Sequence, residues 1–199
     1  MNTRTPDNLK VMLIDEAPDR SESIADILKA AGCEVIACIS PGHDLLEQIE
    51  QSQPDLVIID IELPDRDIME NLQSVQASTP RPMVMFSQDD QGYTIRRAIE
   101  AGVSAYVVDD VDISRVRPVI DAAIATFDRY QLLHKQLEVT QSELYKRDSV
   151  EAAKRVIMEQ RGVDDAEAYK IIRRTAMDQR VKVVDIAERI IDAAKLLCG

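Results

Sequence analysis

Short apolar runs alternate with amphipathic segments along the first 110 residues. Continuous aliphatic runs without polar alternation are typical of strands buried on both faces of a parallel sheet. Gly32 and Gly102 each follow a helical segment, where helices commonly end on glycine. The pattern therefore predicts an α/β domain with a doubly wound, five-stranded parallel sheet. The expected strands are 11–14, 34–39, 56–59, 83–86 and 105–108, and the expected helices are about 19–31, 44–51, 67–77 and 91–101.

A long helix is predicted next. After Pro118, which we expect in its first turn, neither glycine nor proline occurs before Gly162. Apolar positions alternately four and three residues apart form a heptad seam, as in a coiled coil. We expect this seam to pack on the sheet before Thr126 and to pair with a second copy after it; the alternative is a helix that packs only within its own chain. The seam comprises Val119, Ala123, Thr126, Tyr130, Leu133, Leu137, Thr140 and Leu144.

The last 50 residues predict three short helices with one small core. Asp148 and Glu151 have the spacing of a capping box, so we expect a new helix to begin there. It should end near Arg161, before Gly162, and two further amphipathic helices should follow over 164–179 and 183–197. The chain then divides into an α/β domain (1–125), a coiled-coil linker helix (126–147) and an all-α module (148–199).

Charge separates the two folded parts. The net charge is −12, from 24 basic and 36 acidic residues. Residues 148–199 hold ten of each, so the first 147 residues carry the whole excess. An acidic domain repels nucleic acid, whereas a neutral tail does not. No apolar run approaches the roughly 20 residues of a membrane span, and three scattered cysteines favour a cytoplasmic protein.

Acidic side chains stand at the ends of the expected strands. Asp15, Glu16 and Asp60 follow two strands, and Ser87 ends the next. Residues at these ends converge on one crevice in a doubly wound sheet. Three carboxylates there suit Mg²⁺, and an aspartate beside Mg²⁺ can accept a phosphoryl group. The alternative is that these acids only solvate the sheet edge.

These residues resemble the receiver domain of two-component response regulators. The resemblance covers about residues 9–125 and rests on the stretches 11–16, 60–64 and 86–87. It implies that Asp15 and Glu16 hold the metal, that Asp60 is the phosphoacceptor, and that Ser87 and Tyr106 are the switch hydroxyl and the switch aromatic.

One position departs from the receiver pattern. Receivers carry a lysine after the fifth strand, where this chain has Asp109. A phosphoryl group adds about −1.5 to −2 charges and would meet a further anion. The sequence therefore favours a pseudo-receiver that requires no cofactor and binds Mg²⁺ at most weakly at Asp15, Glu16 and Asp60. The alternative is a regulator activated by phosphorylation of Asp60.

The tail resembles an ANTAR domain, an RNA-binding module of transcription antitermination regulators. The resemblance covers about residues 140–197 and rests on the stretches 150–158 with 161–162 and 168–177 with 184–187, although Arg155 replaces the usual glycine. The stretches 81–86 and 101–106, with Asp109, are most similar to the nitrate-assimilation antiterminators. In that subgroup a nitrate/nitrite-sensing protein sequesters the regulator.

Basic residues of the tail form the expected RNA-binding set. Lys170, Arg173 and Arg174 share one face of a helix because they lie at i, i+3 and i+4. Such groups contact phosphates, and Tyr169 either stacks on an exposed base or packs in the core. The alternative is a solvated surface balanced by neighbouring acids. The full set is Lys154, Arg155, Arg161, Tyr169, Lys170, Arg173, Arg174 and Lys182.

The sequence thus predicts a non-enzymatic regulator. We expect a homodimer that binds hairpins in leader mRNA, favours an antiterminator structure and is inhibited by a sensor protein. No nucleophile–base pair is recognisable. Two alternatives stay open: a response regulator switched through Asp60, and an adaptor whose tail binds protein.

Overall fold

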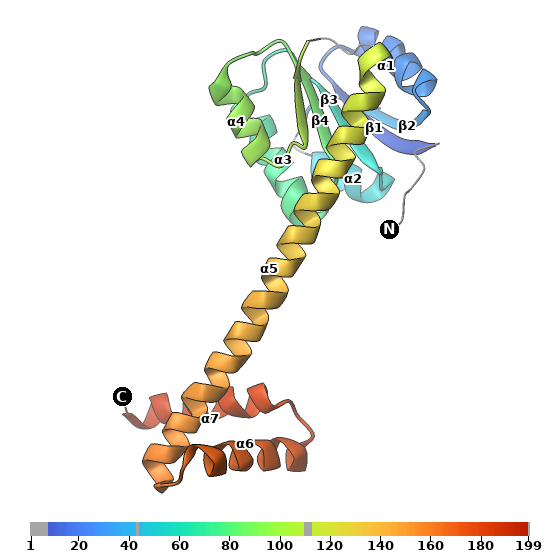
Figure 1. Cartoon of the computed structure of the whole chain (residues 1–199). Coiled ribbons are helices and arrows are strands. Elements are labelled where there is room, and N and C mark those ends of the chain that lie inside the picture. Colours follow the sequence, from blue (N-terminus) through green and yellow to red (C-terminus); the bar gives the residue numbers. More distant parts are fainter. Residues whose placement is uncertain (1–7, 43, 110–112, 199) are drawn as a thin grey trace. The chain divides into compact units, whose positions relative to one another are not determined.

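The computed structural model describes residues 8–42, 44–109 and 113–198. Its α/β part is a five-stranded parallel sheet in the order β2-β1-β3-β4-β5 (Figure 1). The chain places β2 on one side of β1 and then β3, β4 and β5 on the other, so the strand order switches between β1 and β3. At such a switch point a crevice forms at the carboxyl ends of the strands. The predicted fold class is confirmed. The strands are β1 (Leu9–Asp15), β2 (Cys33–Ile39), β3 (Leu56–Asp60), β4 (Met83–Ser87) and β5 (Ala105–Val108).

Two hydrophobic cores lie on opposite faces of the sheet. Alternate residues of β1 divide between them: Val11 and Leu13 pack toward α1 (Pro18–Ala30) and the start of α5 (Ile113–Arg161). Met12 and Ile14 pack toward the helices of the other face. Because β1, β3 and β4 are covered on both sides, all their inner positions are apolar, as the sequence predicted. The other helices are α2 (Leu45–Ser52), α3 (Arg66–Ser78) and α4 (Gly92–Glu100).

Helix α5 runs without a break from Ile113 to Arg161. Two expectations about it were wrong. Pro118 lies inside the helix, beyond its first turn. No new helix begins at Asp148, because the preceding turns already supply carbonyl acceptors for its backbone N–H groups and leave nothing to cap. Glu151 instead binds a lysine side chain, as described below.

The C-terminal helices enclose the third core. The end of α5 packs with α6 (Asp165–Gln179) and α7 (Val183–Cys198) around seven buried apolar residues. Gly162 has a φ of +64° and ends α5, as expected. The chain separates into two compact units, residues 1–131 and 132–199, so α5 contributes to both. Within the described residues, no helix has the length and apolar character needed to cross a membrane.

Replacing Gly102 by alanine should destabilise the α/β unit by about 1–3 kcal/mol. Gly102 has a φ of +97°, and an added Cβ would lie 2.6 Å from Gln76 Cγ. The same change at Gly92 meets nothing within 4 Å and should alter stability by less than about 0.5 kcal/mol. Urea unfolding followed by circular dichroism measures both. Equal stabilities of the two variants would contradict this account of Gly102.

Candidate functional site

Asp15, Asp60 and Ser87 lie together at the carboxyl edge of the sheet. Asp15 ends β1 directly opposite Asp60 at the end of β3, and Ser87 ends β4. All three are buried, at 2%, 7% and 2% exposure. The parallel register therefore brings the expected phosphoacceptor Asp60, a second carboxylate and the expected switch hydroxyl Ser87 to one edge of the sheet, which we call the acidic pocket. Glu16, by contrast, is exposed.

Both carboxylate oxygens of Asp15 accept hydrogen bonds. Oδ1 accepts from the Ala17 N–H at 2.8 Å, and Oδ2 accepts from Ser21 Oγ at 3.0 Å. The two donors fix the Asp15 carboxylate, at the end of β1, against Ala17 in the following loop and Ser21 in α1. Sequence reasoning missed Ser21; its signal was a hydroxyl in the first turns of the helix that follows a strand-ending aspartate.

Of the three carboxylates expected to hold magnesium, Asp15 and Asp60 lie at the same edge of the sheet and Glu16 is at the surface. Within the residues that the structure describes, no group of three acidic, histidine or cysteine side chains is arranged to hold a metal. Mg²⁺ usually binds one or two carboxylates and keeps several waters; Asp15 and Asp60 are the two buried carboxylates here that could hold it.

Ser87 connects the pocket to the loop between β4 and α4. Its hydroxyl donates to the Glu62 carbonyl at 2.9 Å and accepts from the Asp89 N–H at 3.1 Å. The Tyr106 hydroxyl donates to the Asp89 carbonyl at 2.8 Å. Burial raises the pKa of Tyr106 above its usual value, so it remains a neutral donor. The two expected switch residues therefore hold one loop, with Asp89 between them.

Asp109 lies at the surface. Its side chain is 71% exposed, and a carboxylate oxygen lies 3.8 Å from a guanidinium nitrogen of Arg115. An exposed ion pair of this length contributes little to stability. The structure thus places an anion where receivers carry lysine, but outside the buried group formed by Asp15, Asp60 and Ser87.

The basic residues of the C-terminal unit do not share one environment. Lys170, Arg173 and Arg174 project from α6 into solvent, and the neighbouring Met177 is 68% exposed. This face therefore does not pack on the core of the unit. Arg155, Arg161 and Lys182 are exposed as well. We name the exposed set the basic surface: Arg155, Arg161, Lys170, Arg173, Arg174 and Lys182.

Lys154 belongs to the interior instead. Its side chain is only 10% exposed, and Nζ lies 2.8 Å from Glu151 and 2.6 Å from Asp165. Hydrogen bonds to Asp165 and then Glu151 raise the pKa of Lys154, so it is charged at neutral pH. The lysine joins α5 to the start of α6, and the geometry assigns it to positioning these helices. The sequence analysis listed Lys154 among the expected RNA contacts. The ion pair with Asp165 was not predictable there, because Asp165 lies on the next helix, across a turn.

Tyr169 is 43% exposed on α6, between the two environments that the sequence left open. Its neighbour Ala168 is fully buried in the core. Tyr169 is not among the side chains that pack on this core, so its ring has a face in solvent that a base can contact.

The residues of the heptad seam differ in burial on the two sides of Thr126. Val119 and Ala123 pack in the sheet core. Beyond it the apolar seam residues lie on the surface: Tyr130, Leu133, Leu137 and Leu144 are 57%, 54%, 54% and 54% exposed. A row of half-exposed leucines on a helix is an unsatisfied apolar surface.

Two family models match the chain. The response regulator receiver domain matches residues 11–121, and the ANTAR domain matches residues 138–191. The receiver model covers more than half of the chain and contains the pocket of Asp15, Asp60 and Ser87. The chain therefore belongs to the response regulators that join a receiver to an ANTAR domain, a non-enzymatic family of transcription antitermination regulators.

Relatives support the same assignment. The transcriptional regulatory protein PdtaR of Mycobacterium tuberculosis is 30% identical over 178 residues, which cover 89% of this chain and 86% of that protein. The chemotaxis protein CheY of Listeria monocytogenes is 28% identical over 116 residues, covering 58% of this chain and 98% of CheY. The receiver domain of the response regulator NarL from Mycobacterium tuberculosis, at 21% identity and a TM-score of 0.52, covers 59% of this chain and 98% of that one. The NarL likeness shows the fold alone.

Proposed function

We propose that this chain binds hairpins in leader mRNA through the basic surface and thereby favours an antiterminator structure. The observation that carries the proposal is the solvent-facing row of Lys170, Arg173 and Arg174 on α6, beside the half-exposed ring of Tyr169. Cations on one helix face contact phosphates, and aromatic rings stack on unpaired bases. Because the receiver carries the chain's negative excess, general attraction to RNA is weak and this local surface supplies the contact.

The unit's zero net charge does not oppose this proposal. Lys170 and Arg174 form exposed ion pairs with Glu167 and Asp178 at 3.2 and 4.0 Å. Exposed pairs of this kind are weak, so a phosphate can replace the carboxylate. Within the described residues, Arg155, Arg161, Arg173 and Lys182 have no ion-pair partner at all.

We further propose that an inhibitory sensor protein controls the RNA binding of this chain and releases it when the signal arrives. The proposed target is the leader of a nitrate/nitrite-assimilation operon. Asp109 in place of the receiver lysine supports a mode that does not depend on phosphorylation. The buried group of Asp15, Asp60 and Ser87 favours the second candidate, a regulator switched through Asp60. Either way we place the linker at 126–147, between the receiver (1–125) and the ANTAR domain (148–199), in a cytoplasmic homodimer.

Changing Arg173 and Arg174 together to alanine should weaken binding to a paired-hairpin leader RNA by about 10–100-fold. The log–log salt slope should become shallower by about 1.4–1.8, because two phosphate contacts are lost. Filter binding at several salt concentrations measures both quantities. A matched control, Arg96 and Arg97 to alanine on α4, removes the same charge from the receiver and should leave affinity and slope unchanged. A folded Arg173/Arg174 variant with unaltered binding would favour the adaptor alternative.

Replacing Leu133 and Leu137 by aspartate should convert a dimer into a monomer, because the variant sets like charges in the seam. Sedimentation of the isolated protein at about 50 µM measures this; that concentration detects any association stronger than about −6 kcal/mol. Leu132 and Val139 are equally exposed, at 58% and 52%, but lie off the seam. Their replacement by aspartate should leave the dimer intact. A monomeric wild-type protein would refute the proposed seam.

Acetyl phosphate with Mg²⁺ should leave the intact mass of the protein unchanged. The reason is electrostatic: an added phosphoryl group carries about −1.5 to −2 charges, and Asp109 stands where receivers carry the lysine that pairs with it. The variant Asp60→Asn should retain RNA affinity and antitermination. A stoichiometric mass gain that disappears in this variant would instead establish the phosphorylated alternative.

A further inference from the structure

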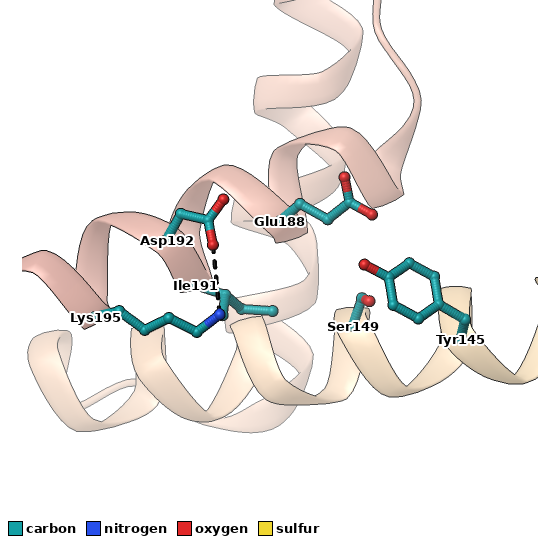
Figure 2. Close-up of a pocket in the computed structure, with 6 residues that line it drawn as sticks. All are labelled: Tyr145, Ser149, Glu188, Ile191, Asp192 and Lys195. Carbon is teal, nitrogen blue, oxygen red and sulfur yellow. Dashed lines mark hydrogen bonds and ion pairs between the residues drawn. The ribbon is translucent and has the colours of Figure 1, made fainter.

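A pocket of about 160 Å³ opens between α5 and α7 in the C-terminal unit (Figure 2). It contains none of the residues of the basic surface. Its lining residues are Tyr145, Ser149, Glu188, Ile191, Asp192 and Lys195.

Ser149 lines the pocket with a hydroxyl that has no partner within the described residues. It is 7% exposed, and its side chain has no hydrogen bond within the described part of the chain. Helical hydroxyls elsewhere in this unit donate to the carbonyl four residues earlier, as Thr140 and Thr175 do at 2.9 Å. The Ser149 hydroxyl is therefore available to donate to or accept from a molecule that enters the pocket.

Two more polar groups converge on the same space. Figure 2 shows the Tyr145 hydroxyl directed toward the Glu188 carboxylate, beside Ser149. Glu188 is half-buried, and neither it nor Tyr145 has a hydrogen bond or ion pair to any described residue. The pocket therefore holds an unpaired carboxylate, two free hydroxyls and one aromatic face.

The local charge selects the ligand's sign. Lys195 lies 3.5 Å from Asp192 at the rim, so this pair is neutral and Glu188 leaves the pocket with one net negative charge. A phosphate would be repelled. A cation instead gains a charge-assisted hydrogen bond to Glu188, further bonds to the hydroxyls and contact with the tyrosine ring.

We infer that this pocket binds the guanidinium or primary ammonium group of an organic cation. The group is either part of a free small molecule or the end of an arginine or lysine side chain of a partner protein. Ser149 and Tyr145 lie on the side of α5 that faces α7, away from Leu137 and Leu144 of the seam, by the helical repeat. The site therefore remains open when the seam pairs, and the inference does not depend on the proposed RNA binding.

The test is an NMR titration of the full chain with butylguanidinium at constant ionic strength, using the neutral near-isostere butylurea as the control ligand. We expect saturable shifts of the amides of Ser149, Glu188 and Asp192 with butylguanidinium only. Glu188→Gln should weaken binding at least about tenfold, and Ser149→Ala should weaken it less. Glu159→Gln removes an exposed carboxylate outside the pocket and should have no effect.

A peptide arm identifies the source of the cation. If a capped Ala-Arg-Ala peptide binds at least as tightly as butylguanidinium, the site receives a protein side chain. If the free cation binds and the peptide does not, the site receives a small molecule. Absence of saturable shifts at these amides, or identical binding by the folded Glu188→Gln variant, would overturn the inference.

Discussion

The rest of the structure depends on one helix that belongs to two cores. The first turns of α5 bury Val116, Ile120 and Ala123 against the sheet, and its last turns bury Ala153 and Ile157 in the ANTAR unit. Between them, every residue from 132 to 148 is exposed. Most of the stability of a helix in a protein comes from tertiary packing of an apolar face, and this stretch has none within the described residues. Its middle is therefore held by its two buried ends and, in our proposal, by a second copy of the chain along the seam.

This continuity also explains which sequence signals succeeded. The apolar runs correctly predicted the strands, because burial on both faces of a sheet selects apolar residues at successive positions. The helix ends at Gly32, Gly102 and Gly162 were also predicted correctly, because each glycine adopts a positive φ that depends only on the local backbone. The capping box at Asp148 and Glu151 failed, because a cap matters only where a helix lacks a preceding turn. An uninterrupted helix turned the same glutamate into a partner for Lys154. A local motif therefore has its usual meaning only when the chain on both sides of it is known.

The sites were less predictable than the fold for the same physical reason. The convergence of Asp15, Asp60 and Ser87 follows from parallel register, which the strand pattern implies. The outward position of Asp109 depends on a loop conformation, and the burial of Lys154 depends on Asp165 across a turn. The pocket around Ser149 requires α5 and α7 to lie side by side, and nothing in the spacing of the residues records that.

The C-terminal unit is neutral in total, yet its charges are sorted by environment. Lys154 is bound between two carboxylates in a nearly buried position, and exchanging them for phosphates would break the contact between α5 and α6. Lys170 and Arg174 hold their partners at the surface, where water and salt screen the pairs and exchange has little cost. Glu188 has no partner among the described residues and lines the pocket beside the hydroxyls of Tyr145 and Ser149, which favour a cation. In our proposals a net charge of zero thus conceals one surface that receives an anion and one pocket that receives a cation, and burial, more than charge count, separates the proposed binding residues from Lys154.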